Sequence, residues 1–142
     1  MAALTVARST PRQLSSESPL ISGLSVPVKA ATKCIQGGIA VANAGFAAPG
    51  TGVTGLVALG VFEDTFDNTA GANGAIRARI RRGVFPFNNL GTDLLTQADL
   101  GAQCFIEDDN TVRRTSNTST RSAAGKFLGF ADDGVSVMVE IY

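Results

Sequence analysis

Short apolar runs separated by turn residues limit what this chain can fold into. From about residue 29 onward, runs rich in Val, Ile, Ala and Phe alternate at close intervals with Gly, Asn, Asp and Pro. Such spacing is typical of an all-β sandwich or barrel rather than of alternating strands and helices. No segment carries the apolar period of a long helix. We therefore expect an all-β fold, either a single β-sandwich or jelly-roll-like domain or a small β-barrel.

The clearest predicted strand spans residues 75–82. Its apolar side chains Ile76, Ala78 and Ile80 alternate with arginines at 77, 79 and 81. Strict alternation matches the two-residue period of a strand, so one side of this strand packs on a core and the other carries guanidinium groups. Residues 83–87 continue it in extended form, with Pro86 marking an edge or a bend.

Turn residues delimit further strands. A first strand is expected at 26–31, a hairpin at 39–42 and 46–48, and a strand at 56–62 with a bulge or close backbone approach at Gly60. One or two helical turns are predicted at 93–100, capped by Thr92. Strands at 104–107 and 111–115 precede a closing hairpin of 125–131 and 135–142 around Asp132 and Asp133.

Residues 1–28 differ from the rest of the chain. They are rich in Ser and Pro, and their apolar residues, among them Leu14, Leu20 and Ile21, are scattered singly. Such a stretch is either a frayed tail or an extended arm that becomes ordered on a neighbouring molecule. We divide the chain accordingly into an extended N-terminal arm, 1–28, and an all-β domain, 29–142.

Cellular location is constrained only indirectly. Arg8 and Arg12 interrupt the N-terminal apolar residues, so no secretion signal is recognised and an intracellular origin with reduced thiols is expected. Cys34 and Cys104 are then small buried hydrophobes rather than a bridge. No apolar stretch is long enough to span a membrane as a helix.

The sequence contains no recognisable catalytic or cofactor-binding motif in the context that such a motif requires. Histidine is absent, which removes the commonest general base and metal ligand. The glycines at 50, 52 and 55 match a dinucleotide-binding spacing, but a predicted strand follows them where that motif needs a helix. The acidic group Glu63, Asp64 and Asp67 is the best metal candidate, and whether it binds a cation stays open. We expect no enzyme, no catalytic residue and no cofactor.

The arginines are the main candidate for an interaction site. Arg77, Arg79, Arg81 and Arg82 form a basic stripe, which Arg113 and Arg114 would extend if their strands were neighbours. Formal net charge is zero, with 12 basic and 12 acidic residues, and there is no Trp and one Tyr to stack on bases. We therefore expect no specific nucleic-acid binding, but a solvated face or a contact with an acidic protein.

Several segments resemble one family, the head decoration or cement proteins of tailed bacteriophages. The segments that carry the resemblance are QGGIAVANAGFAAP at 36–49, GLVALGVFE at 55–63 with DNTAG at 67–71, RRGVFPFN at 81–88, TQADLG at 96–101 with CFIEDDNTV at 104–112, and RSAAGK at 121–126 with the strand 134–140. Together they span about residues 29–142. They are patterns of strands and turns, with no catalytic signature among them.

The resemblance implies a structural protein of the virion. Such a subunit is made in the bacterial host cytoplasm, sits on the outer surface of the capsid, contacts the major capsid protein, and assembles as a homo-dimer or homo-trimer. The contact residues we expect are Arg77, Arg79, Arg81, Arg82, Phe85, Phe87, Leu14, Leu20 and Ile21. Two alternatives remain open: another β-sandwich virion subunit of the tail or an adaptor, and a metal- or carbohydrate-dependent protein.

Overall fold

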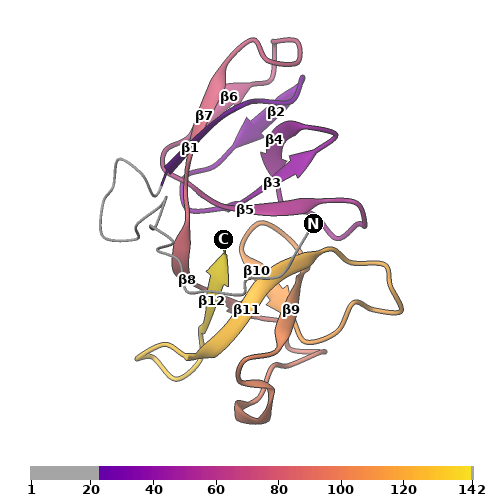
Figure 1. The fold of residues 1–142 in the computed structure, drawn as a ribbon, viewed down its shortest axis with the longest axis vertical. Helices are drawn as coiled ribbons and strands as arrows, with labels where there is room; N and C mark the ends of the chain where they lie inside the picture. The colour runs from indigo at the N-terminus through magenta and orange to yellow at the C-terminus, as the bar shows by residue number, and fades with distance from the viewer. Residues whose placement is uncertain (1–22, 142) are drawn as a thin grey trace, which may run out of the picture.

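The computed structural model describes residues 23–141 and confirms the all-β fold (Figure 1). Two lobes follow each other along the chain, and β7 of the first lobe runs almost directly into β8 of the second. The first lobe contains β1 (Gly23–Pro27), β2 (Thr32–Cys34), β3 (Ile39–Asn43), β4 (Phe46–Pro49), β5 (Val57–Phe62), β6 (Phe66–Asn68) and β7 (Arg77–Arg81). The second, called here the barrel lobe, contains β8 (Gly83–Asn89), the 3-10 helix η1 (Gln97–Asp99), β9 (Gln103–Ile106), β10 (Thr111–Arg113), β11 (Ala123–Phe130) and β12 (Val137–Ile141).

The first lobe is a curled antiparallel sheet in the order β1-β7-β5-β3-β4. Its two outer strands approach each other, because Val28 bridges to Ala47 and the N–H of Lys29 donates to the carbonyl of Ala47 at 3.0 Å. A buried cluster fills the inside of the curl, made of Val28, Cys34, Ala40, Ala47, Phe62, Ala78 and Ile80. The two-stranded ribbon of β2 and β6 contributes Cys34 and the partly buried Phe66 to this cluster.

The barrel lobe is a closed five-stranded barrel in the order β10-β8-β12-β11-β9. All its pairings are antiparallel except that of β8 with β10. Pro86 lies within β8, opposite Met138 of β12. Since the N–H groups of Asn88 and Leu90 donate toward β10, the nitrogen of Pro86 points to the same side, where the pairing with β10 has not yet begun. A residue without an N–H therefore costs no ladder hydrogen bond there.

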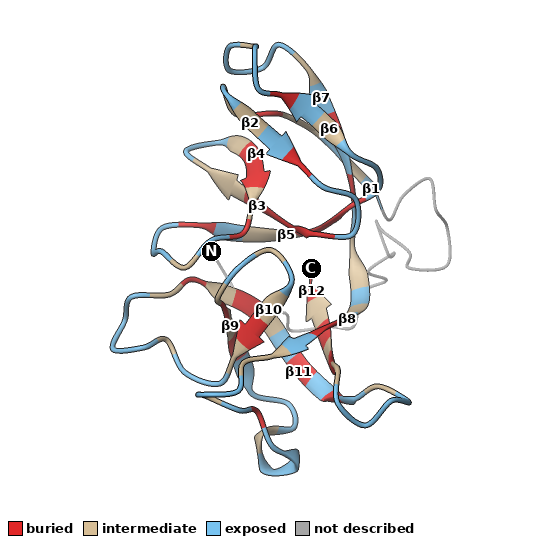
Figure 2. Cartoon of the chain, turned by 180° about the vertical axis from the view of Figure 1, so that it is seen from behind, coloured by how far each residue is buried: buried red, intermediate tan, exposed pale blue. Residues whose placement is uncertain are grey.

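The two lobes share one core. Ile39, Val41 and Val61, from the outer face of the curled sheet, belong to the same buried cluster as Phe127 and Val139 of the barrel. Figure 2 shows buried stretches of β5 lying along the boundary between the lobes. The central strands of the curled sheet are thus covered on both faces, which suits their largely apolar sequences.

Most local predictions agree with the structure. β3 and β4 form the expected hairpin, and β7 alternates as predicted, with Ala78 and Ile80 buried and the three arginines exposed. The register between β3 and β5 shifts beside Gly60, which has a φ of +151°. A Cβ at this glycine would collide with the carbonyl oxygen of Arg81 on β7, so the strand approaches its neighbour more closely than other residues allow.

Three local predictions need correction. The helical segment is shorter than predicted and begins after Thr96 rather than Thr92; the N–H and the hydroxyl of Thr96 donate to the Asp99 carboxylate at 2.8 and 3.1 Å. The first strand is Gly23–Pro27 rather than 26–31, so part of the segment assigned to the arm pairs with β7. Phe87, expected at the surface, is only 2% exposed.

Candidate interaction surface

Three arginines on the outer side of β7 form what we call the arginine face: Arg77, Arg79 and Arg81. The Nε of Arg77 donates to the hydroxyl of Ser25 at 3.0 Å, and its Nη2 donates to the Ser25 carbonyl at 2.7 Å. Arg79 pairs with Glu63 at 3.3 Å, although both side chains remain about half exposed or more. These contacts hold the Arg77 guanidinium against β1 and the Arg79 guanidinium against Glu63, which follows β5, and leave both exposed.

Arg81 lies where β7 meets β8. Its guanidinium carbon is 5.8 Å from the centre of the Phe85 ring, a cation–π distance. No carboxylate within residues 23–141 forms an ion pair with it. Among the described residues, Arg81 is therefore held by an aromatic ring rather than by a carboxylate.

The other predicted arginines do not join this face. Arg82 is partly buried, and its Nε is buried without an acceptor among the described residues. β10 neighbours β8 and β9 rather than β7, so Arg113 and Arg114 lie in the barrel lobe. Arg113 pairs there with Asp93 and Glu107, at 3.0 and 2.9 Å, and Arg114 with Asp99 at 3.0 Å. The extension of the stripe by Arg113 and Arg114 is therefore wrong.

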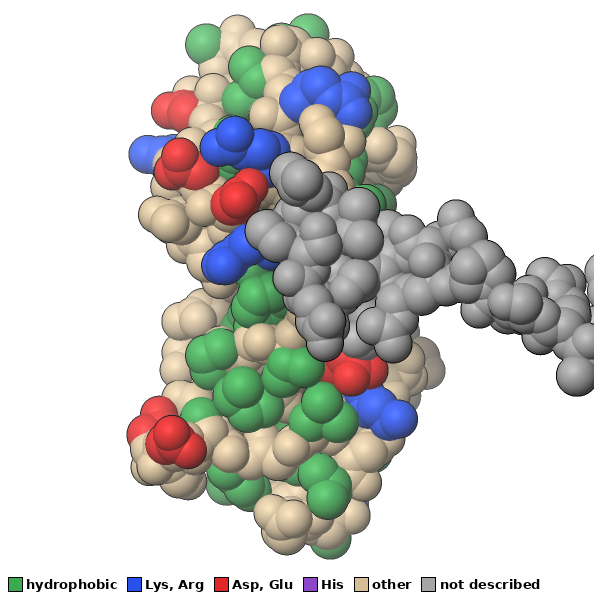
Figure 3. All heavy atoms as spheres, turned by 60° about the vertical axis from the view of Figure 1, so that its left-hand side comes forward, with side chains coloured by type: hydrophobic (Ala, Val, Ile, Leu, Met, Phe, Trp, Pro, Cys, Tyr) green, Lys and Arg blue, Asp and Glu red, His purple; other side chains and the backbone are tan. Residues whose placement is uncertain are grey.

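The outer side of β8, β12 and β11 carries a second feature, which we call the apolar face: Val84, Pro86, Met138, Leu128 and Phe130. Val84, Leu128 and Phe130 are 42%, 38% and 37% exposed. Figure 3 shows hydrophobic side chains gathered over the barrel lobe, below charged side chains of the first lobe. Exposed apolar side chains grouped in this way mark contact surfaces, whereas isolated ones do not.

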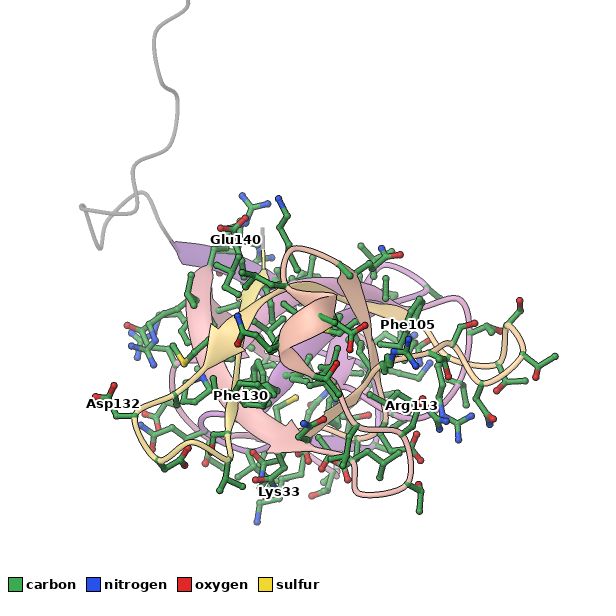
Figure 4. All side chains as sticks on the ribbon, turned by 90° about the horizontal axis from the view of Figure 1, so that it is seen from below. Lys33, Phe105, Arg113, Phe130, Asp132 and Glu140 are labelled. Atoms are coloured by element: carbon green, nitrogen blue, oxygen red, sulfur yellow. The ribbon has the colours of Figure 1, made fainter. Side chains whose placement is uncertain are left out.

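Charged residues flank the apolar face at both ends. Arg81 lies beyond Val84 along the chain, at the end nearest the first lobe. Asp132 and Asp133 lie at the opposite end, in the turn between β11 and β12. Seen from below, Asp132 lies at the outer edge of the molecule on the same side as Phe130 (Figure 4). Two further charged residues share this outer side: Glu140 of β12 lies opposite Val84, and Lys126 of β11 lies opposite Glu140.

Sequence reasoning identified the arginine face but not the apolar face. Its members sit on strands whose other side is also apolar, as Met138 does between the buried Val137 and Val139. The sequence does contain a signal for this face, namely strands that are apolar on both sides. A small barrel cannot bury the outer side of such strands, so their outward apolar side chains are left exposed. Of the predicted aromatic contacts, Phe85 is partly buried and packs on the barrel core. Phe87 belongs to that core, so it cannot make the surface contact expected of it.

The remaining predicted contacts, Leu14, Leu20 and Ile21, lie outside the described residues.

The acidic loop around β6 uses its oxygens within the chain. Asp64 accepts the N–H of Thr65 at 2.7 Å, and Asp67 accepts the N–H and the hydroxyl of Thr69 at 3.0 and 2.7 Å. These hydrogen bonds from Thr69 hold the pKa of Asp67 below its usual value. Between residues 23 and 141, no three Asp, Glu or Cys side chains are grouped so that they could hold a metal ion.

Both cysteines are buried free thiols. Burial raises the pKa of Cys34 to about 11 and that of Cys104 to about 12. Since the thiolate is the reactive form, neither side chain is activated as a nucleophile. The expectation that they act as small buried hydrophobes is confirmed by their places in the two cores.

Comparisons with known proteins give no relative for this chain: no family model, no curated protein and no solved structure matches it. Within the described part of the chain, no helix is long and apolar enough to cross a membrane. What the structure shows is an all-β protein of two lobes with an exposed arginine face on the first lobe and an exposed apolar face on the barrel lobe.

Proposed function

We propose that this chain is a structural virion protein that binds the outer surface of a tailed-phage capsid and cements neighbouring subunits of the major capsid protein. The observation that carries the proposal is the arginine face. Hydrogen bonds to Ser25 and an ion pair with Glu63 orient Arg77 and Arg79 while leaving their side chains exposed. An oriented guanidinium loses little side-chain entropy when it pairs bidentately with a carboxylate of a partner.

Cementing requires no chemistry beyond binding. A protein that binds the assembled shell and not its separated subunits stabilises the shell by mass action. One copy that touches two capsid subunits at once gains further from effective concentration. An all-β subunit with a shared core and a rigid basic face suits this task, as does the resemblance of residues 29–142 to decoration proteins.

Co-sedimentation with undecorated phage heads tests the proposal. The protein should sediment with the heads, and the double variant Arg77→Glu with Arg79→Glu should bind at least tenfold more weakly. The matched control is Lys33→Glu, which reverses a charge on the exposed side of β2. Wild-type protein that stays in the supernatant, or binding equally strong in the double variant, would contradict the proposal.

The alternative, a subunit of the tail or of an adaptor, differs in where the protein sits on the particle. Imaging of gold-labelled protein on complete virions separates the two. Label spread over the head supports a cement protein, and label confined to one vertex or to the tail supports the alternative.

A further inference from the structure

We propose that residues 18–22 continue β1 as a strand, which we call the strap, and pair with an open edge of β8 in the same chain. This inference goes beyond the proposed function, because it concerns the fold of the chain itself and holds with or without a capsid. Three features of the described residues support it: an unpaired stretch of the sheet edge, the direction of β1, and the side chains beside the gap.

The even-numbered residues of β7 and β8 turn their backbone N–H and C=O groups toward one edge. Where this edge meets the end of β1, the N–H of Val28 donates to the carbonyl of Ile76 at 3.0 Å. Just before β10, the carbonyl of Asn110 accepts the N–H of Asn88 at 2.9 Å. Between these two pairings, at residues 82–86, no strand of the described part of the chain lies alongside. An unpaired strand edge of this kind is a template for a further strand.

β1 runs directly into this gap. It is antiparallel to β7, and its first residue, Gly23, lies opposite Arg81. If the strand continues toward the N-terminus, residues 22 to 18 come opposite residues 82 to 86. Five residues at about 3.3 Å each span roughly 17 Å. The strap ends there, because β10 takes over this edge at Asn88. The gap therefore has the length and the direction of the segment that enters it.

The two prolines in this pairing interrupt no hydrogen bond that it requires. Pro19 is odd-numbered, so its nitrogen faces away from β8, as that of a proline on an edge strand does. Pro86 lies opposite Ser18 at the last pair of the gap, where its carbonyl accepts and no donor is needed from it.

Apolar side chains beside the gap gain a cover from the strap. Residues directly opposite each other in two strands lie on the same face of the sheet. Leu20 therefore lies beside Val84, an exposed member of the apolar face. Pro19 lies beside Phe85, which is only partly buried although it packs on the barrel core. Both contacts remove apolar surface from water, which favours the pairing.

The guanidinium of Arg82 is an independent indication. Its Nε is buried without an acceptor among the described residues, and buried donors of this kind are nearly always paired in folded proteins. Ser22 lies opposite Arg82 in the strap, on the same side of the sheet, so its hydroxyl can accept from this Nε. Arg77 makes the equivalent contact with β1, where its Nε donates to the hydroxyl of Ser25 at 3.0 Å.

The strap connects the two lobes a second time, because β1 belongs to the first lobe and β8 to the barrel lobe. It also moves the start of the folded domain to about residue 18. Of the capsid contacts expected in the arm, Leu20 and Ile21 then belong to the domain, and Leu14 alone remains in the arm.

Nuclear Overhauser effects in the isotope-labelled full-length protein test the pairing. Antiparallel strands bring the Hα atoms of residues in non-hydrogen-bonded pairs close together. Cross-peaks are therefore expected between the Hα atoms of Pro19 and Phe85, and between those of Ile21 and Gly83. A mixture of two differently labelled samples separates contacts within one chain from contacts between chains. Absence of these cross-peaks, or their occurrence only between chains, overturns the inference.

Hydrogen exchange measures whether the strap closes the edge. The Val84 amide should exchange much more slowly than in an unstructured peptide, and about tenfold faster in Leu20→Pro, which lacks the N–H that donates to the Val84 carbonyl. Glu17→Pro is the matched control, because it places the same residue just beyond the gap and should leave the Val84 amide unchanged. The Phe127 amide, which donates to Ala102 at 2.9 Å, reports on the barrel and should be unchanged in both variants.

A Val84 amide that exchanges as fast as a free peptide, or equally slowly in wild-type protein and Leu20→Pro, would also overturn the inference. The proposed function rests on the arginine face and not on the strap. Protein that lacks the pairing but still sediments with phage heads therefore overturns this inference alone.

Discussion

One partly buried guanidinium, that of Arg113, connects separate segments of the barrel lobe. Its side chain is 11% exposed, and it donates to Asp93 at 3.0 Å and to Glu107 at 2.9 Å. Glu107 also accepts from Arg121 at 2.9 Å, while the N–H and hydroxyl of Thr115 donate to Asp93. Charge-assisted hydrogen bonds in a partly desolvated site are stronger than those at an open surface, so this network fixes the loops around β10.

The network makes stability depend on acid pH. Hydrogen bonds from Arg121 and then Arg113 lower the pKa of Glu107 below 4.5, and a hydrogen bond from Thr115 leads those that lower the pKa of Asp93 below 3.8. A carboxyl whose pKa is lower in the folded state stabilises the fold fully above its unfolded pKa. This stability is lost as the pH falls through the folded value. Unfolding free energy should therefore be steady above about pH 4.5 and decline below it.

The variant Glu107→Gln tests this dependence. It should cost about 1–3 kcal/mol at pH 7, because it removes the charge from hydrogen bonds with two arginines. It should cost less at pH 3, because below about pH 4.5 the unfolded chain takes up a proton at Glu107 and the charge then contributes less to stability. Urea denaturation at both pH values measures the difference. The control is Asp132→Asn, at an exposed turn. An equal cost of Glu107→Gln at pH 7 and pH 3 would contradict the argument.

At the scale of the elements, the turn of the hairpin formed by β11 and β12 is held by one side chain, Asp133. The carboxylate of Asp133 accepts the N–H groups of Val135 and Ser136 at 2.9 and 2.8 Å, and the hydroxyl of Ser136 at 2.7 Å. These bonds take the place of backbone pairing where the chain reverses. They also hold the pKa of Asp133 below its usual value, with the N–H of Val135 the largest cause.

Removal of this carboxylate should loosen the hairpin. Asp133→Ala should lower the unfolding free energy and the melting temperature, since it removes the acceptor of three hydrogen bonds at the turn. The neighbouring variant Asp132→Ala should change it by less than about 0.5 kcal/mol, as is usual at exposed sites. Thermal denaturation of the two variants side by side measures the contrast. Equal losses would show that the hairpin is held by its strands rather than by Asp133.

Elements with one buried side were predictable, and elements without one were less so. β7 alternates between buried and exposed residues, and β12 between buried and partly buried ones, which fixes both their existence and their orientation. The sequence predicts the position of β8 correctly, but it predicts Phe85 and Phe87 on the exposed side, whereas Val84 and Pro86 occupy that side in the structure. Gly83, at a φ of +149°, shifts the alternation by one residue between β7 and β8. A backbone kink of this kind has no signature in the apolar pattern, so Phe87 appeared to share the exposed side of the arginines.

The candidate site was predictable in part for the same reason. The arginine face follows from the alternation of a single strand. The apolar face is assembled from β8, β12 and β11, and sequence spacing cannot tell which outward side chains of separate strands become neighbours. Arg113 illustrates this limit: its partner Asp93 is 20 positions away and is brought close by the barrel.

At the scale of the molecule, the two lobes are joined by their shared core rather than by a linker. Ile39 and Val41 come from the curled sheet, yet they lie in one buried cluster with Phe127 and Ile106 of the barrel. Gly50 shows how close this packing is, because a Cβ there would lie 3.0 Å from a methyl carbon of Ile106 and 3.4 Å from Ile39. Neither lobe can bury its apolar surface without the other, so we expect them to unfold together.

The variant Ile39→Ala tests this cooperativity. Removal of three buried carbons from a site with no exposure should cost about 2–4 kcal/mol of unfolding free energy. Hydrogen exchange can follow both lobes, through the Phe62 amide, which donates to Gly38, and the Phe127 amide, which donates to Ala102. Because the lobes share the damaged core, both amides should lose the same amount of protection. Val135→Ala, at a side chain 70% exposed, should alter neither. Faster exchange at Phe62 with no change at Phe127 would mean that the lobes unfold independently.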